Sequence, residues 1–219
     1  MFSMHHRWER FFHLVTYIAQ GSSYLNPRGY AILHREHHAY SDGTKDPHSP
    51  RNFRNVLAMM VDTKRRYDDH AYHRVIPEPR FLGGYPEWPA LDRLGQSWTA
   101  RIAWCCVYGA FYWTFATAWW MWLFLPVHFV MGPIHGAIVN WCGHRYGYQT
   151  FDNGDDSRNT FPLDLVTMGE LFQNNHHRAS MSPNFASRWF EIDPGYVFIR
   201  LLALCRIIDL GATPQGVRR

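Results

Sequence analysis

A charge-free run of 43 residues constrains the fold more than any other feature of this sequence. Between Arg101 and Arg145, the positions 102–144 hold no Asp, Glu, Lys or Arg. One membrane-spanning helix needs about 20 residues, so the run is long enough for two. Pro126 lies near its middle, where it favours a tight connection. We therefore predict a helical hairpin with two membrane spans, at about 102–124 and 127–144.

A buried helix pair of a soluble protein is the alternative interpretation. It is favoured by the mean hydropathy of −0.34 and by the polar residues His128, His135 and Asn140 inside the run. However, charged residues make up only 18% of the chain, below the roughly 25% of soluble domains, and aromatic residues make up 17%. Charge-free runs of this length are rare in soluble cores, which favours the membrane.

The hairpin also predicts the topology. Both flanks, 1–100 and 145–219, return to the same side, and their Lys and Arg residues identify that side as the cytoplasm. The fold class that we expect is all-α: a multi-pass integral membrane protein, of a bacterial inner membrane, with a helical hairpin and a cytoplasmic helical cap. A chain of this length fits one domain, 1–219.

Several function classes have little support. The net charge is only +4 and the basic residues are scattered, which argues against nucleic-acid binding. The four cysteines lack the spacing of metal ligands or of a secreted disulfide framework. The sequence contains no HExxH motif, no nucleophile elbow and no glycine-rich phosphate loop.

Histidines occur in two clusters with the same spacing. His34, His37 and His38 stand at i, i+3 and i+4, which places three imidazoles on one face of a helix. In the second cluster, Gln173 takes the first position of the same pattern, and His176 and His177 take the other two. Each histidine alone could be held by ordinary hydrogen bonds, but two matching clusters predict a metal site.

A third element lies where the second span would end. Asn140 and His144 are one helical turn apart and would face the same way, and an ionisable residue at a membrane boundary indicates function. Six histidines and two amides are nearly enough ligands for two metal ions. Imidazole suits Fe, Zn, Cu and Ni, so the ligand type alone does not name the metal.

Carboxylates accompany both clusters. Asp42 and Asp46 follow the first one, and Glu170 precedes the second. Such carboxylates can accept the second ring N–H of a ligand histidine and fix its tautomer. Ordinary turn and capping roles are the alternative for all three.

Three stretches, HREHHAYSDGTKDPHSP, VNWCGHRYGYQTFDNGDDSRN and GELFQNNHHR, resemble the membrane-bound fatty acid desaturase family, in particular its bacterial acyl-CoA and acyl-lipid members. The resemblance implies a centre of two iron ions and an oxygen-dependent insertion of a double bond into a fatty acyl chain. It also implies no catalytic side chain beyond the metal centre. The implied ligands are His34, His37, His38, His144, His176, His177, Asn140, directly or through water, and Gln173.

The sequence departs from the family pattern in two places. Gln173 replaces the first histidine of the third family box, and its amide could be a weaker ligand. The first family box, H-x(3,4)-H after two membrane spans, has no counterpart, and His5, His6 and His13 do not reproduce its spacing. We therefore expect an N-terminally truncated, partial desaturase domain.

These considerations leave three functional hypotheses. The first is an acyl desaturase, the second a related hydroxylase or alkane monooxygenase, and the third an inactive remnant. An active enzyme would need a fatty acyl substrate, O2, membrane lipid and an external electron carrier of the ferredoxin, rubredoxin or cytochrome b5 type. Basic residues are candidates for headgroup recognition by charge and location: Arg51, Arg54, Lys64 and Arg65.

Overall fold

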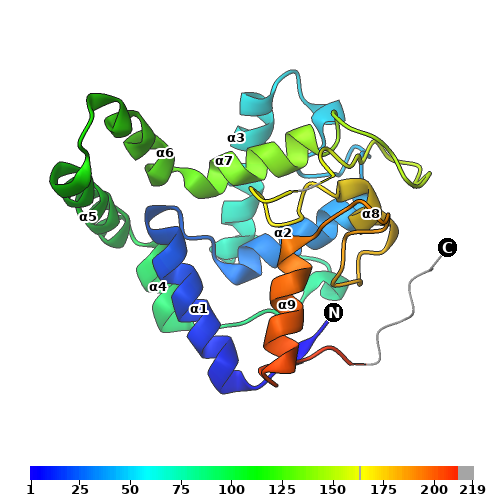
Figure 1. Ribbon diagram of the computed structural model, residues 1–219, viewed down its shortest axis with the longest axis horizontal. Helices are drawn as coiled ribbons and strands as arrows, with labels where there is room; N and C mark the ends of the chain where they lie inside the picture. The colour runs from blue at the N-terminus through cyan, green and yellow to red at the C-terminus, as the bar shows by residue number, and fades with distance from the viewer. Residues whose placement is uncertain (163, 212–219) are drawn as a thin grey trace. The chain divides into compact units, whose positions relative to one another are not determined.

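The computed structural model describes residues 1–162 and 164–211, which form helices joined by long loops (Figure 1). The helical fold class is confirmed, with one small addition: β1 (Ser3–Met4) pairs antiparallel with β2 (Ile208–Asp209), with Ser3 opposite Asp209. The helices are α1 (His6–Gln20), α2 (Pro27–Tyr40), α3 (Val56–Ala71), α4 (Pro89–Gln96), α5 (Trp98–Phe115), α6 (Leu125–Phe129), α7 (Met131–Ala137), α8 (Gln173–Arg178) and α9 (Pro194–Leu204).

The chain divides into two compact units. The first comprises Met1–Trp8, Glu36–Thr63 and Ala137–Arg219, and the second comprises Glu9–Arg35 and Lys64–Gly136. In the second unit, Leu33, Tyr67 and Ala71 form a buried core with Leu25 packed against it. The helix α2 begins there because Asn26 Oδ1 accepts the backbone N–H of Gly29, and Pro27 supplies a preformed first turn.

The charge-free run does not form the two continuous helices that its length predicts. The expected span 102–124 ends at Phe115, and a short 3₁₀ segment, η4 (Trp119–Phe124), follows it. Pro126 does not connect two helices but lies in the first turn of α6, where its missing N–H costs no helical hydrogen bond.

The expected span 127–144 is also divided, into α6, α7 and the π-helix η5 (Ile138–Cys142). Pro133 explains the break at Val130, because proline has no N–H to donate to the carbonyl four residues earlier. That carbonyl, of Phe129, instead accepts the hydroxyl of Ser22 at 3.0 Å. The hairpin is therefore not confirmed.

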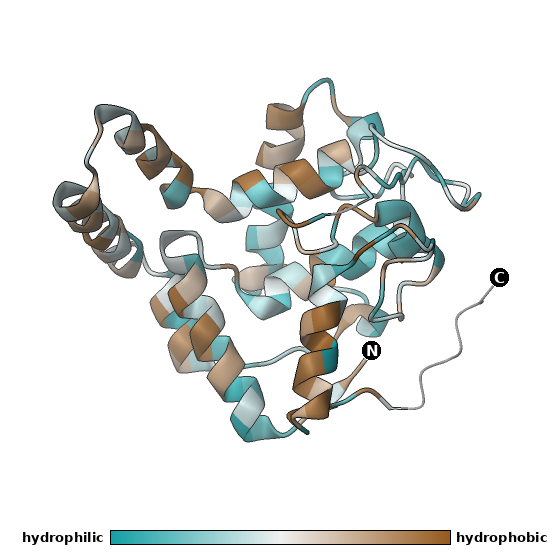
Figure 2. Cartoon of the chain, viewed as in Figure 1, coloured by the Kyte–Doolittle hydropathy of each residue, from teal (hydrophilic) through white to brown (hydrophobic). Residues whose placement is uncertain are grey.

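Among the described residues, no individual helix combines the length and the apolar composition that a membrane crossing requires. The segments Trp119–Phe129 and Met131–Cys142 meet these criteria only together, and they are bent by 77° at their junction. Several large apolar side chains of α5 are exposed, among them Trp113 at 82% and Phe111 at 58%. Figure 2 shows the strongly hydrophobic colouring of α9.

The first unit carries the histidine-bearing loops. After α2, residues 41–55 form turns and a short 3₁₀ helix, η2 (Pro50–Asn52), before α3 begins. Residues 143–162 and 164–172 form loop structure fastened by isolated bridges, in which Asn159 pairs with Tyr148 and with Phe172. Asp193 caps α9 by accepting the N–H of Tyr196, and α9 ends at Leu204.

Candidate metal centre

Three histidines from three separate segments meet in the first unit. His37 lies near the end of α2, His144 in the turn after η5, and His177 on α8. One ring nitrogen from each lies within 4.8 Å of the other two. The Nε2 atoms of His37 and His177 are 3.1 Å apart. The three imidazoles therefore face a common centre.

A carboxylate fixes the other nitrogen of each of these rings. Asp46 lies 2.9 Å from Nδ1 of His37, Asp42 lies 3.2 Å from Nδ1 of His144, and Asp155 lies 2.7 Å from Nδ1 of His177. An ionised carboxylate only accepts hydrogen bonds, so each Nδ1 must carry the ring proton. Each Nε2 then has a lone pair directed away from its carboxylate, which is the arrangement of histidines that bind metals.

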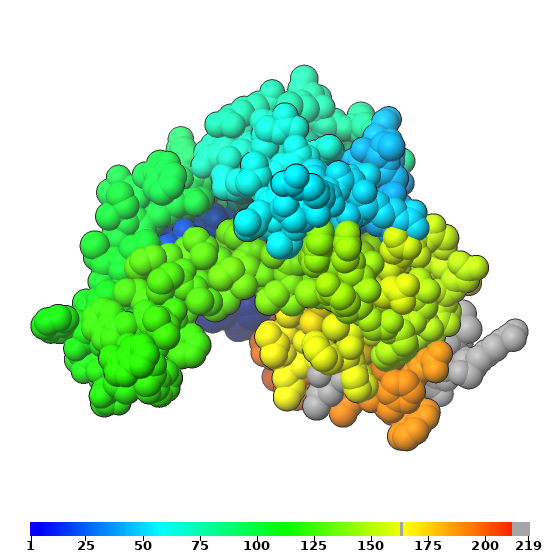
Figure 3. Space-filling model, turned by 90° about the horizontal axis from the view of Figure 1, so that it is seen from above, coloured from blue at the N-terminus to red at the C-terminus, as the bar shows by residue number. Residues whose placement is uncertain are grey.

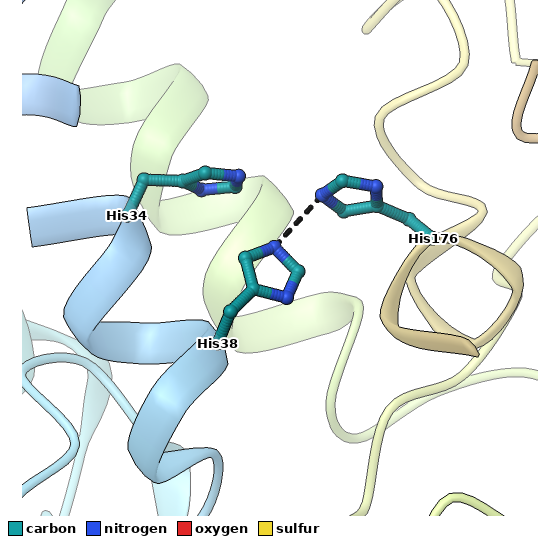
Figure 4. Close-up of side chains that lie close together, drawn as sticks. All are labelled: His34, His38 and His176. Carbon is teal, nitrogen blue, oxygen red and sulfur yellow. Dashed lines mark hydrogen bonds between the residues drawn. The ribbon is translucent and has the colours of Figure 1, made fainter. Parts of the chain in front are cut away.

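A second pair of histidines faces each other close by. His38 of α2 and His176 of α8 have their Nε2 atoms 2.9 Å apart, and the ring of Phe185 packs on His176 with 4.2 Å between ring centroids. Figure 4 shows this pair, with His34 extending from the same side of α2 one turn before His38.

Burial keeps the imidazoles of His37 and His177 neutral. It lowers the pKa of His37 well below its ordinary value, and the neighbouring His48 and His144 lower it further. Burial likewise lowers the pKa of His177, although Asp155 opposes this. Burial alone would raise the pKa of Asp42, but hydrogen bonds from His144, Ser49 and the backbone of Asp156 lower it to about 2. Burial raises the pKa of Asp46 to about 6, so both carboxylates are ionised at neutral pH.

The donor set fits a metal ion. Two imidazole nitrogens bound about 90° apart to one metal, at about 2.0–2.1 Å, lie about 3 Å from each other. The pairs His37–His177 and His38–His176 have this separation. The buried Nε2 of His144 has no hydrogen-bond partner among residues 1–162 and 164–211. These nitrogens could hold one metal ion between His37, His144 and His177, and another beside His38 and His176.

Comparison with known proteins gives this geometry its context. A sequence profile described as fatty acid desaturase matches residues 2–187, most of the chain. The chain belongs to the fatty acid desaturase family. Family members are oxidoreductases of fatty acyl chains and are generally associated with membranes.

Curated relatives are desaturases or closely similar enzymes. A stearoyl-lipid 9-desaturase of Synechocystis is 28% identical over 190 residues, which are 84% of this chain and 55% of the relative. An acyl-CoA 5-desaturase of Anemone leveillei is 28% identical, covering 94% of this chain and 62% of the relative. A hex-5-enoyl-[acyl-carrier protein] acetylenase of Moorena producens is 29% identical, covering 78% and 56%. The chain thus spans little more than half the length of these relatives, and no solved structure matches it.

The surroundings of three predicted residues of this desaturase-family site differ from those that the sequence led us to expect. Asn140 is half-buried in η5, and the helix ends at Cys142, so Asn140 and His144 do not share a helix face as expected. Gln173 is buried, but its amide N–H donates to the backbone carbonyl of Glu170. Glu170 makes no hydrogen bond to a histidine in the described part of the chain. Burial, with Asp193 and Asp164 nearby, raises its pKa to about 7.

The sequence analysis missed Asp155, the carboxylate that holds His177. The signal was present in the acidic segment FDNGDDS, which follows His144 by a few residues, but nothing in its spacing pairs it with α8. The structure also buries His48 against His37, with 4.4 Å between ring centroids. Asp46 and Asp42 lie within hydrogen-bonding distance of Nδ1 of His37 and of His144, respectively.

Two buried asparagines fix α8 and so position its histidines. Asn174 Oδ1 accepts the backbone N–H groups of Thr150 and Phe151, and its amide donates to the carbonyl of Phe151. Asn175 donates to the buried carboxylate of Glu191 at 2.8 Å. The first turn of this desaturase-family helix is therefore tied to the loop that also carries Asp155 and to Glu191.

A polar cleft of about 770 Å³ opens beside the histidines. His38 and His177 line it together with Lys45, Asp152 and Arg178. Its lining is mostly polar, which suits water and charged groups better than an acyl chain.

Proposed function

We propose that this chain carries the metal centre of an acyl desaturase, with two iron ions held by histidines. The reaction would remove two hydrogens from adjacent methylenes of a fatty acyl chain and reduce O2 to two water molecules. O2 takes up four electrons in this conversion. The acyl chain supplies two of them, so an external donor must supply the other two, together with two protons.

One observation carries the metal proposal. With Nδ1 protons donated to Asp46 and Asp155, His37 and His177 direct two lone pairs at each other across 3.1 Å. Two facing lone pairs repel each other unless a cation lies between them. Burial opposes a proton in that position, because it lowers the pKa of both histidines. A metal ion satisfies both nitrogens.

The ligands that we propose are divided between two ions. His37, His144 and His177 would hold one, and His34, His38 and His176 the other. Asn140, directly or through water, and Gln173 remain candidates for further positions. When bound, the irons supply the oxidising power that breaks an unactivated C–H bond.

The residues around the ligands act on the histidines rather than on the substrate. Asp42, Asp46 and Asp155 would fix the tautomers and the ring orientations of their histidines, so that each Nε2 remains a ligand. We assign no proton transfer or nucleophilic step to any side chain, in keeping with a centre in which the metal performs the chemistry.

We further propose that the chain is an integral membrane protein with its histidines on the cytoplasmic side. The exposed aromatic side chains of α5 and η4 support this, because apolar surface of this extent is unfavourable in water. The relatives act on lipid-linked, CoA-linked and carrier-protein-linked chains by their names, so the acyl carrier of this chain is a separate question. A small ferredoxin, rubredoxin or cytochrome b5 type protein would deliver the electrons.

The test is expression of the chain in a host whose own acyl desaturase has been deleted, with lipid analysis and iron determination on the purified protein. We expect new monounsaturated acyl chains and two iron ions per chain. Asp155→Asn should reduce iron affinity about 10- to 100-fold, because the amide cannot accept at both oxygens from His177 and Ser157. Asp152→Asn, three residues earlier in the same loop and exposed, is the matched control and should change neither quantity.

The reaction products also distinguish a desaturase from a hydroxylase and from an inactive protein. Hydroxylated acyl chains would identify a hydroxylase instead. Bound iron without any oxidised product would contradict the desaturase proposal, and a protein that binds no iron under reducing conditions would contradict the metal centre itself.

A further inference from the structure

A second, smaller pocket of about 340 Å³ lies on the first unit beside His144. The segment after α2 forms one side of it with Pro50 and Arg51, and the segment after η5 forms the other with Arg145, Tyr146, Asp156 and Arg158. In Figure 3 the light-blue surface of the first segment borders the yellow-green surface of the second. Asp42 and His144 complete the lining.

The charges in this pocket do not cancel. Arg51 is neutralised by a two-pronged ion pair with Asp156, in which Nη2 lies 2.7 Å from Oδ1. Asp42 already accepts hydrogen bonds from His144, Ser49 and the backbone of Asp156. Both carboxylates of the pocket are thus occupied.

Unlike Arg51, the other two arginines of the pocket, Arg145 and Arg158, form no ion pair within the described residues. Arg145 donates to the carbonyl of Pro50 at 3.3 Å and stacks on the ring of Trp141, with Cζ 4.3 Å from its centroid. Arg158 donates to the carbonyl of Gly147 at 3.2 Å. Neither has a carboxylate partner among residues 1–162 and 164–211, and each keeps further N–H donors. These contacts hold the two guanidinium groups in place without neutralising them.

Two oriented guanidinium groups in a small polar pocket are suited to a tetrahedral oxyanion. Guanidinium groups bind phosphate through paired, charge-assisted hydrogen bonds. The pocket volume lies at the small end of ligand sites, and its lining is largely polar, so an acyl chain would be a poor ligand. We propose that Arg145 and Arg158 form a binding site for a phosphate group.

The phosphate could belong to the carrier of the acyl substrate, such as coenzyme A, or be a free anion. The first possibility rests on the proposed function, whereas phosphate binding itself does not. The pocket lies next to His144, so a carrier phosphate bound there would anchor the substrate one imidazole away from the proposed metal. The sequence-based candidates for headgroup recognition included Arg51 but neither Arg145 nor Arg158.

The experiment is calorimetric titration of the purified full chain, loaded with iron, with inorganic phosphate, pyrophosphate and coenzyme A. We expect saturable binding of pyrophosphate in the millimolar range or tighter. Arg145→Gln and Arg158→Gln should each weaken it at least about tenfold, by loss of charge-assisted hydrogen bonds. Arg200→Gln on α9 is the control and should leave the affinity unchanged.

The comparison of ligands distinguishes the two sources. Coenzyme A that binds tighter than pyrophosphate identifies a carrier site, whereas equal affinities identify a site for free anions. Iron content confirms that each variant is folded, and Arg145→Lys should restore part of the affinity. Absence of saturable binding, or binding that is insensitive to both Gln substitutions, would overturn the site. A protein that binds phosphate but produces no unsaturated chains would refute the proposed function alone.

Discussion

Asp42, Asp46 and Asp155 show how single residues decide the chemistry of this centre. Each carboxylate holds Nδ1 of one histidine and thereby turns the opposite nitrogen into a potential ligand. Glu170 is a carboxylate of a different kind. It is largely buried near Asp164 and Asp193 and forms no ion pair with any residue that the structure describes, and its pKa is raised to about 7 from an ordinary value of 4.5.

The raised pKa of Glu170 predicts a pH-dependent stability. The folded protein binds this proton more tightly than the unfolded chain, so the contribution of Glu170 to stability is greatest below pH 4.5 and is lost as the pH rises to about 7. Because glutamine does not ionise, the Glu170→Gln variant does not lose this stability as the pH rises. We expect the variant to be more stable than the parent by roughly 1–3 kcal/mol at pH 8 and about equally stable at pH 4.5.

Denaturant unfolding of both proteins at the two pH values measures this difference. Glu78→Gln, at a largely exposed position, is the control and should show no such pH-dependent gain. An equal effect of Glu170→Gln at both pH values would show that the carboxyl is not buried as described.

At the scale of elements, the turn that follows η5 positions His144. The π-helix ends at Cys142, and Gly143 then packs between two neighbours. A Cβ atom at Gly143 would lie 2.4 Å from the carbonyl oxygen of Val139 and 2.5 Å from Cγ of Gln173. The turn and α8 can therefore approach only because this residue has no side chain. π-helical turns are frequent at functional sites, which agrees with this position.

We predict that Gly143→Ala destabilises the protein by about 1–3 kcal/mol, because a backbone carbonyl must shift to admit the methyl group. The variant should also bind iron more weakly, since His144 is the next residue. Gly109→Ala in α5 is the control: its Cβ meets nothing within 4 Å, and the helix should gain about 0.5–1 kcal/mol. Denaturant unfolding and iron titration provide both measurements, and a Gly143→Ala protein as stable as the parent would contradict the close packing.

At the scale of the whole molecule, the histidines of the first unit come from distant parts of the chain. His37 and His38 end α2, His144 follows about 100 residues later, and His176 and His177 lie on α8. A bound metal would cross-link these segments. The second unit contains α5, which carries none of these ligands.

Removal of metal should therefore destabilise the two units unequally. At free iron about 1,000-fold above its dissociation constant, binding contributes about 4 kcal/mol, which chelation removes. Hydrogen exchange before and after chelation measures the effect by segment. We expect protection to fall in α8 and in the backbone around His144, with little change in α5. A uniform change across the chain, or none, would contradict the proposed cross-link.

Much of the site was predictable from the sequence. The i, i+3, i+4 spacing places His34, His37 and His38 on one helix face by helical geometry alone, and the same pattern marks His176 and His177. The position of Asp42 and Asp46 directly after the first cluster also made them candidate partners of ligand histidines. These features are local, because a few residues of one segment determine them.

The tertiary structure decided the rest, for reasons that sequence spacing does not contain. The charge-free run predicts the length of an apolar segment but not whether that segment forms one unbroken helix. Pro133 and the Ser22 hydroxyl interrupt the helix between α6 and α7. Asp155 became the partner of His177 because the loop 143–172 folds back on α8 through Asn174 and Asn175. The sequence by itself determined which residues are candidate metal ligands. The long-range packing of loops, which joins residues more than 100 positions apart, decided which nitrogens face each other.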